Sequence, residues 1–134
     1  FSAIKEYMDR IIKQAHEAGY VETITGRRRY LRDINSRNYT LRSYAERNAI
    51  NAPIQGSAAD IIKVAMIRID DWLKKEALQS KMILQVHDEL VFDVYKPELD
   101  ELKTLIKSEM EHAFDLPVPL DVDLGLGANW LEAH

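Results

Sequence analysis

Cysteine is absent from the 134-residue chain. Without thiols the protein can form neither a disulfide framework nor a thiolate zinc site, and nothing indicates an oxidising compartment. Long apolar runs are also missing, since no stretch approaches the roughly 20 residues that a membrane-spanning helix needs. The first residues lack the pattern of a signal peptide. We therefore expect a soluble, cytoplasmic protein without a membrane partner.

An initiator methionine is missing as well. The chain begins at Phe1 inside a helical apolar pattern, and no capping residue precedes it. We therefore expect a fragment whose preceding sequence is not included. The length is enough for one domain, residues 1–134, with a genuine hydrophobic core.

Apolar spacing and the positions of glycine and proline predict the secondary structure. Gly19 is expected to end the first helix, and Pro53 to interrupt the helical path that starts near Thr40. Pro117 and Pro119 restrict the last strand to an edge or a bulge. The predicted order is helix 1–18, hairpin 20–32, helix 40–53, helix 54–73, hairpin 82–94, helix 97–113 and strand 118–126. This order predicts an α+β fold, an antiparallel sheet with helices packed on one face.

Charge is distributed unevenly along the chain. The net charge of −4 would by itself argue against a nucleic-acid partner. Residues 26–47 nevertheless hold seven arginines and two acids, a local charge of +5, whereas residues 86–134 hold twelve acids and three lysines, a charge of −9. The cations are Arg27, Arg28, Arg29, Arg32, Arg37, Arg42 and Arg47. Because arginine binds phosphate through a planar fork and stacks on bases, the segment predicts a polyanion-binding face. A solvated basic loop is the alternative.

Two adjacent carboxylates, Asp88 and Glu89, stand between two apolar strand-like arms in the run QVHDELVF. Asp-Glu is not a favoured two-residue turn, so its presence between good strands hints at function. Hard cations need clustered oxygens, and a tight turn would hold these two carboxylates with little freedom. The pattern predicts a divalent metal site. The alternative is that both acids only solvate the turn. His87 could donate to a phosphate, a sugar or a base edge.

Arg47, Asn51 and Gln55 recur at every fourth position and would form one polar stripe on a roughly continuous helix. Arginine, asparagine and glutamine are the side chains that hydrogen-bond base edges, including the acceptors of the minor groove. An ordinary exposed helix face is the alternative. His16 and His112 have no partners at ligand spacing, and we expect no role for them.

Several long motifs, in order along the chain, are similar to the C-terminal part of the bacterial family A DNA polymerases, the DNA polymerase I group. They are GYVET from Gly19, GRRRY from Gly26, AERNAINAPIQGSAAD from Ala45, QVHDELV from Gln85 and the ending GANW through His134. The resemblance implies template-directed transfer of nucleotides to a primer 3′-hydroxyl in DNA replication and repair. It also implies that this chain is part of the palm with adjoining elements of the fingers or thumb side.

The resemblance assigns roles to individual residues. Asp88 becomes a ligand of the two magnesium ions of nucleotidyl transfer, and Glu89 an adjacent carboxylate that shapes the catalytic site. His87 and the polar stripe become contacts to the primer-template near the primer terminus, largely from the minor groove. Arg27, Arg28, Arg29 and Arg42 are expected as further DNA contacts. The implied reaction is in-line attack of the primer 3′-hydroxyl on the α-phosphate of a dNTP.

Two parts of the family's site have no counterpart in residues 1–134. One is the second aspartate of the two-metal site, and the other is the fingers helix that binds most of the dNTP; both belong upstream of Phe1. The polypeptide alone is therefore expected to be inactive, with the parent protein as the enzyme. A missing strand would leave a sheet edge open, and self-association through that edge is a further hypothesis. The alternative functions are a non-catalytic DNA-binding module and a metal-dependent phosphohydrolase using Asp88 and Glu89.

Overall fold

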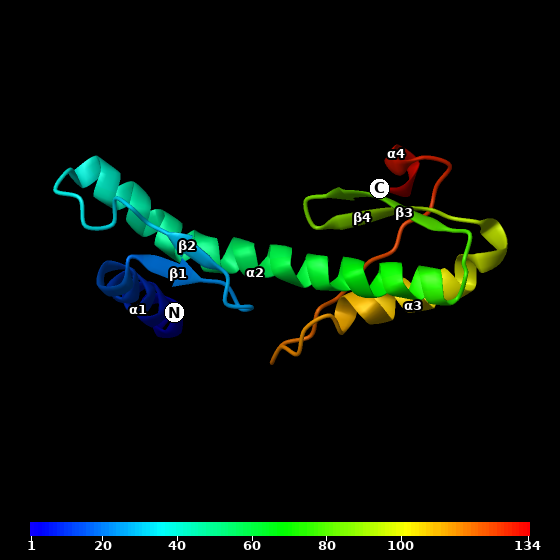
Figure 1. The fold of residues 1–134 in the computed structure, drawn as a ribbon, viewed down its shortest axis with the longest axis horizontal. Helices are drawn as coiled ribbons and strands as arrows, with labels where there is room; N and C mark the ends of the chain where they lie inside the picture. Colours follow the sequence, from blue (N-terminus) through cyan, green and yellow to red (C-terminus); the bar gives the residue numbers. More distant parts are fainter. The chain divides into compact units, whose positions relative to one another are not determined.

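The computed structural model describes all 134 residues, and the chain divides into two compact units, Phe1–Asp60 and Ile61–His134. Helices and two antiparallel hairpins make up the chain (Figure 1), which confirms the predicted α+β class. The elements are α1 (Ser2–Ala18), β1 (Tyr20–Glu22), β2 (Arg28–Tyr30), α2 (Tyr39–Lys75), β3 (Lys81–Val86), β4 (Glu89–Asp93), the 3₁₀ turn η1 (Lys96–Glu98), α3 (Leu99–Glu111) and α4 (Trp130–Ala133). None of the helices combines the length and apolarity that crossing a membrane requires.

The first unit packs α1, the β1–β2 hairpin and the first part of α2 around a small core. Its buried residues are Ala15, Val21, Leu31, Ile34, Ala45 and Ala49. Helix α1 ends as predicted, because Gly19 takes a φ of 80° and its N–H donates to the carbonyl of Ala15 at 2.8 Å. The predicted hairpin is confirmed. Arg28 and Arg29 lie on β2, paired with Glu22 and Val21 respectively.

Helix α2 is continuous from Tyr39 to Lys75 with Pro53 inside it, so the prediction of two helices separated at Pro53 was wrong. Proline inside a helix removes one hydrogen bond and clashes with the carbonyl four residues earlier, at a cost of about 3 kcal/mol. Tertiary contacts offset this cost, because Ala45 and Ala49 before the proline are buried in the core and Asp60 after it is buried as well.

His16 ties α1 to the loop before α2 and to α2 itself, a role that the sequence did not indicate. Its Nδ1 lies 2.8 Å from Oδ1 of Asn35, and its Nε2 lies 2.9 Å from Oε1 of Glu46. The amide nitrogen of Asn35 donates to the carbonyl of His16 at 3.1 Å, which orients the Asn35 oxygen toward the ring. Both ring nitrogens therefore face acceptors, and the hydrogen bonds to Asn35 and Glu46 raise the pKa of His16.

The stability of the first unit should consequently depend on pH through His16. Because the folded pKa lies above the unfolded value of 6.5, the stabilisation is fully present below pH 6.5 and is lost as the pH rises through the folded pKa. We expect the free energy of unfolding to fall by up to about 1 kcal/mol across this range, and His16→Gln to remove that part of the dependence. Urea denaturation of both proteins at pH 6 and pH 8 measures it. His112→Gln is the control, and an unchanged pH dependence in His16→Gln would contradict the assignment.

The second unit packs the β3–β4 hairpin against the last part of α2 and α3. Its buried core residues are Ile69, Leu73, Leu102 and Ile106. Met82, Leu90 and Phe92 of the hairpin pack on this core, and Ile83 forms an irregularity between the pairs Met82↔Phe92 and Leu84↔Val91. The hairpin predicted over 82–94 is confirmed.

Glu98 in η1 holds the two ends of this hairpin together. Its carboxylate accepts hydrogen bonds from the N–H groups of Gln79 and Ser80 and from Oγ of Ser80, at 2.8–2.9 Å. The buried Ser80 hydroxyl in turn accepts from the N–H of Tyr95 at 2.9 Å. Desolvation raises the pKa of Glu98, but these hydrogen bonds outweigh it and leave the pKa lowered. The segments flanking the hairpin are thereby joined, which helps to fix its base.

The strand predicted over 118–126 was wrong, because this segment has no regular secondary structure and pairs with neither hairpin. Pro117 and Pro119 carry no N–H, so the start of the segment cannot donate to a ladder at these two positions. Helix α4 follows and begins with a reciprocal cap. The N–H of Glu132 donates to Oδ1 of Asn129 at 2.9 Å, while Oε2 of Glu132 accepts from the N–H of Ala128 at 2.9 Å.

Candidate nucleic-acid interface

The tip of the β3–β4 hairpin is formed by His87 and Asp88. Val86 pairs with Glu89, so the two-residue turn lies one position earlier than the Asp88–Glu89 turn expected from the sequence. His87 has a φ of 53°, the left-handed conformation that tight two-residue hairpin turns need. The side-chain amide of Gln85 donates to the carbonyl of His87 at 3.0 Å and supports the turn. Asp88 therefore projects from the tip, and Glu89 is the first residue of β4.

The two carboxylates at the tip have different surroundings. Asp88 is exposed and makes no side-chain hydrogen bond or ion pair. Glu89 is half-buried: its Oε1 lies 2.9 Å from Nε2 of His134, and its Oε2 accepts from the indole N–H of Trp130 at 3.4 Å. The Trp130 and His134 rings are in edge contact at 5.4 Å. The sequence analysis did not indicate this contact of Trp130 with Glu89.

Asp88 and Glu89 do not make a complete metal site. No group of three or more His, Cys, Asp or Glu side chains in the chain could hold a metal ion. Magnesium requires near-octahedral oxygen coordination, and a two-metal site requires ligands for both ions. The residues of this chain therefore do not by themselves fit the magnesium pair that the resemblance implies, and we assign no chemical step to a metal.

The polar stripe of α2 lies on one exposed helix face. Arg47, Asn51 and Gln55 are all exposed, and because α2 continues through Pro53, successive members are rotated by only about 40° around the helix axis. The buried residues Ala45 and Ala49 face the core. The side chains of the stripe make no hydrogen bond or ion pair within the chain and can approach an extended partner as one row.

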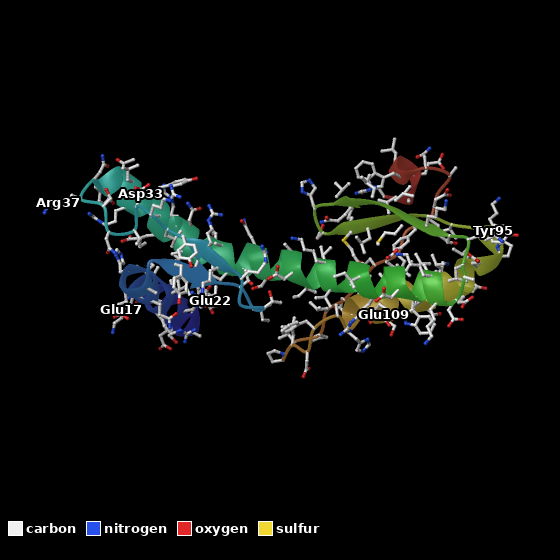
Figure 2. All side chains as sticks on the ribbon, viewed as in Figure 1. Glu17, Glu22, Asp33, Arg37, Tyr95 and Glu109 are labelled. Atoms are coloured by element: carbon white, nitrogen blue, oxygen red, sulfur yellow. The ribbon has the colours of Figure 1, made fainter.

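The arginines of the basic segment divide into engaged and free side chains. Nε of Arg28 lies 3.1 Å from Oε1 of Glu22, and its guanidinium stacks over the Tyr20 ring at 4.3 Å. Arg42 donates to the carbonyl of Ser36 at 3.0 Å, and Arg27 pairs with Asp60. Figure 2 shows the side chain of Arg37 extending away from the ribbon. The side chains that make no hydrogen bond or ion pair are those of Arg29, Arg32, Arg37 and Arg47, all exposed. Their guanidinium donors are available to a polyanion.

The chain thus presents free guanidinium groups, exposed amides and an exposed carboxylate at a hairpin tip. A comparison with known protein families identifies a family to which it belongs. The family model described as DNA polymerase family A matches residues 1–132. The chain belongs to DNA polymerase family A. The resemblance inferred from the motifs is thereby confirmed.

Similar family A chains are known from several bacteria. DNA polymerase I of Streptococcus pneumoniae serotype 4 is 56% identical over 133 residues, and that of Geobacillus stearothermophilus is 52% identical over 133 residues. Each match covers 99% of this chain and 15% of the relative. The chain therefore spans a small part of the length of these relatives.

A solved structure described as the POL domain of Pol1 from M. smegmatis in complex with DNA primer-template and dNTP is also similar. It has a TM-score of 0.97 and 49% sequence identity, and the match covers 99% of this chain and 24% of that chain. The bound DNA and dNTP are properties of that complex.

Proposed function

We propose that the chain is part of a DNA-templated DNA polymerase, which adds nucleotides to a primer 3′-hydroxyl in DNA replication and repair. The observation that carries the proposal is the family A match over residues 1–132, which includes both the acidic hairpin and the polar stripe. The similar POL domain in complex with primer-template and dNTP supports the same substrates. A cytoplasmic location follows within this proposal, because bacterial DNA is its substrate.

Within this proposal the stripe Arg47, Asn51 and Gln55 binds the primer-template from the minor groove, where its side chains can reach base acceptors. His87, Arg28, Arg29 and Arg42 add contacts to phosphates and sugars. Asp88 is the catalytic carboxylate: it is exposed at the hairpin turn and unpaired, whereas Glu89 beside it is held by His134 and Trp130. In the reaction the primer oxygen bonds to the α-phosphorus of the dNTP, the bond from that phosphorus to the β-phosphate oxygen breaks so that pyrophosphate leaves, and the hydroxyl proton passes to solvent. A magnesium pair at this site requires acidic ligands in addition to Asp88 and Glu89.

Removing the charge of Arg47 should weaken binding of a primer-template duplex by about tenfold. It should also make the slope of the logarithm of the affinity against the logarithm of the salt concentration shallower by about one. The reason is that Arg47 has no internal partner and offers all its donors to DNA. Fluorescence anisotropy of a labelled duplex over a NaCl series, with the chain and its Arg47→Met variant, measures both quantities. Arg10→Met on α1, outside the stripe, is the matched control. Equal effects of the two substitutions, or binding that does not depend on salt, would contradict the proposal.

A further inference from the structure

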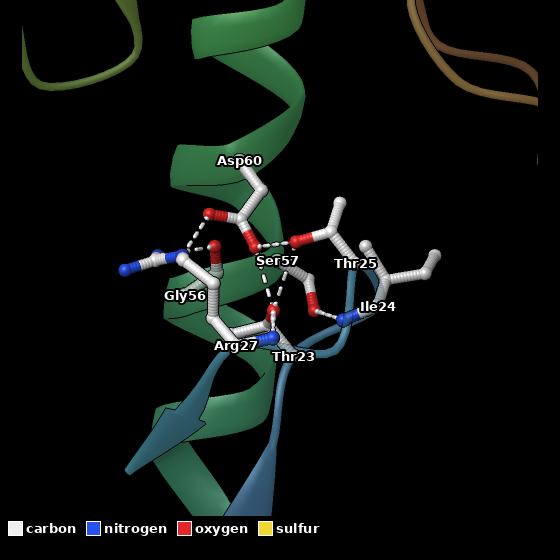
Figure 3. A network of polar contacts seen from close by, with 7 residues as sticks. All are labelled: Thr23, Ile24, Thr25, Arg27, Gly56, Ser57 and Asp60. Carbon is white, nitrogen blue, oxygen red and sulfur yellow. Dashed lines mark hydrogen bonds and ion pairs between the residues drawn. The ribbon is translucent and has the colours of Figure 1, made fainter.

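Asp60 is a buried acid at the centre of a polar network on α2. Its side chain is 4% exposed. Oδ2 accepts hydrogen bonds from the hydroxyls of Thr23 at 2.6 Å and Thr25 at 2.5 Å, and Oδ1 accepts from Nε of Arg27 at 2.6 Å (Figure 3). Desolvation raises the pKa of Asp60, but the hydrogen bonds and the Arg27 charge outweigh it, so the pKa is lowered. A buried carboxylate is costly unless it is paired and hydrogen-bonded, and the loop between β1 and β2 supplies both kinds of partner.

The same loop is docked on α2 at two further points (Figure 3). The N–H of Ile24 donates to the hydroxyl of Ser57 at 2.8 Å. Gly56 permits close approach, because a Cβ at this position would lie 2.6 Å from Cγ2 of Thr23. Around the helix, Asp60 lies about 140° from Gln55 and about 180° from Asn51, and Gly56 and Ser57 lie at least about 100° from either, so the network is not on the face of the polar stripe. Its effect must pass through the hairpin.

Arg27 is the link between Asp60 and strand β2. The N–H of Thr23 donates to the carbonyl of Arg27 at 2.8 Å, and β2 begins at the next residue. A register slip of one residue would turn every side chain of β2 to the other face. In the observed register Arg28 lies on the face of Tyr20 and Glu22, and Arg29 lies opposite Val21. Holding Arg27 therefore fixes which way Arg28 and Arg29 point.

We propose that Asp60 is a positioning residue for DNA binding: by holding Thr23, Thr25 and Arg27 it sets the register of β2 and thereby the presentation of Arg28 and Arg29. Arg27 is then an anchor and not a DNA contact. The proposal rests on the proposed function in that Arg28 and Arg29 are taken as DNA contacts.

Amide hydrogen exchange of the 134-residue chain tests the register without DNA. The amides of Thr23 and Leu31, which donate across the hairpin to Arg27 and Gly19, report on it. We expect Asp60→Asn and Thr25→Val to accelerate their exchange by about tenfold, because the loop is released from α2. Thr25→Ser retains the hydroxyl, so the exchange rates of these two amides should stay within about twofold of those in the unchanged chain. Equal rates in Thr25→Val and Thr25→Ser overturn the proposal, even where Asp60→Asn fails to fold.

Binding of a labelled primer-template duplex tests the consequence for DNA. Arg29→Met should weaken binding about fivefold in the unchanged chain and by less than about twofold in the Asp60→Asn background, since coupled residues are not additive. Arg47→Met should keep its full effect in that background, which a general loss of structure would not allow. The double variant with Arg27→Met and Asp60→Asn should bind the duplex as tightly as Asp60→Asn alone. A full Arg29 effect in the Asp60→Asn background overturns the proposal. If the unchanged chain does not bind DNA, the proposed function fails at this step, and the exchange rates still decide whether Asp60 sets the register.

Discussion

Asp88→Asn is expected to slow template-directed nucleotide addition by about 10³-fold in a polymerase that carries this chain, equivalent to about 4 kcal/mol of transition-state stabilisation. The substitution removes one charge and changes the side-chain size very little. Asp88 is exposed at a tight turn and has no partner within the chain, so its carboxylate oxygens are free to bind cationic or hydrogen-bond-donating groups of the complete polymerase site. Single-turnover primer extension at saturating DNA and dNTP measures the rate of the chemical step.

The matched control is Asp93→Asn at the far end of the same hairpin. Asp93 is also exposed, ends β4 and makes no side-chain hydrogen bond. Asp93→Asn should leave the rate of nucleotide addition within about twofold of that of the unchanged polymerase. The reason is that charges separated by a Debye length in solvent are largely screened. Binding of the primer-template by anisotropy separates a loss of chemistry from a loss of affinity. A rate retained in Asp88→Asn, or lost equally in both variants, would contradict the assigned role.

Ile69→Ala should lower the free energy of unfolding of the second unit by about 3–4 kcal/mol. Ile69 is completely buried and packs in one cluster with Leu73, Leu102 and Ile106. Truncation removes apolar contact area and leaves a cavity that neighbouring helices cannot fill entirely. Because domains are stable by only about 5–15 kcal/mol, a large fraction of the stability is lost. Urea denaturation followed by circular dichroism measures the change. The dependence of the free energy of unfolding on urea concentration should be the same in both proteins.

Ile67→Ala provides the control for this effect on the same helix. Ile67 is 64% exposed, two residues before Ile69, and the substitution removes the same atoms. It should change the free energy of unfolding by no more than about 0.5 kcal/mol. Comparable losses for the two substitutions would mean that the core of this unit is not where the structure places it.

Local patterns predicted the elements whose ends are set by local chemistry. Helix α1 ends at Gly19 because glycine takes a positive φ there, and the hairpins follow from runs of strand-forming residues around short turns. The predictions were wrong where contacts between residues distant in sequence determine the secondary structure. Packing on both sides of Pro53 keeps α2 continuous, and residues 118–126 lack a neighbouring strand despite their alternation.

The candidate site divides in the same way. The acidic tip and the stripe were found because their residue types and spacing are local, although the turn lies at His87 and Asp88. The contacts of Asp60 and His16 were missed because their partners are distant in sequence: Thr23 lies 37 residues from Asp60, and Asn35 and Glu46 lie 19 and 30 residues from His16. One local signal existed: Thr23, Thr25 and Arg27 alternate, so three polar side chains of the loop could point to one side.

The contact of His134 with Glu89 has a practical bearing on how this protein is handled. Residues added after His134, such as an affinity tag, would begin beside a carboxylate at the hairpin tip, 2.9 Å from the His134 ring. A polyhistidine tag there could exchange imidazoles with His134 and would bring metal-binding groups to Glu89. Recombinant protein intended for measurements at Asp88 and Glu89 is therefore better purified through a fusion at the other end, or with the tag cleaved.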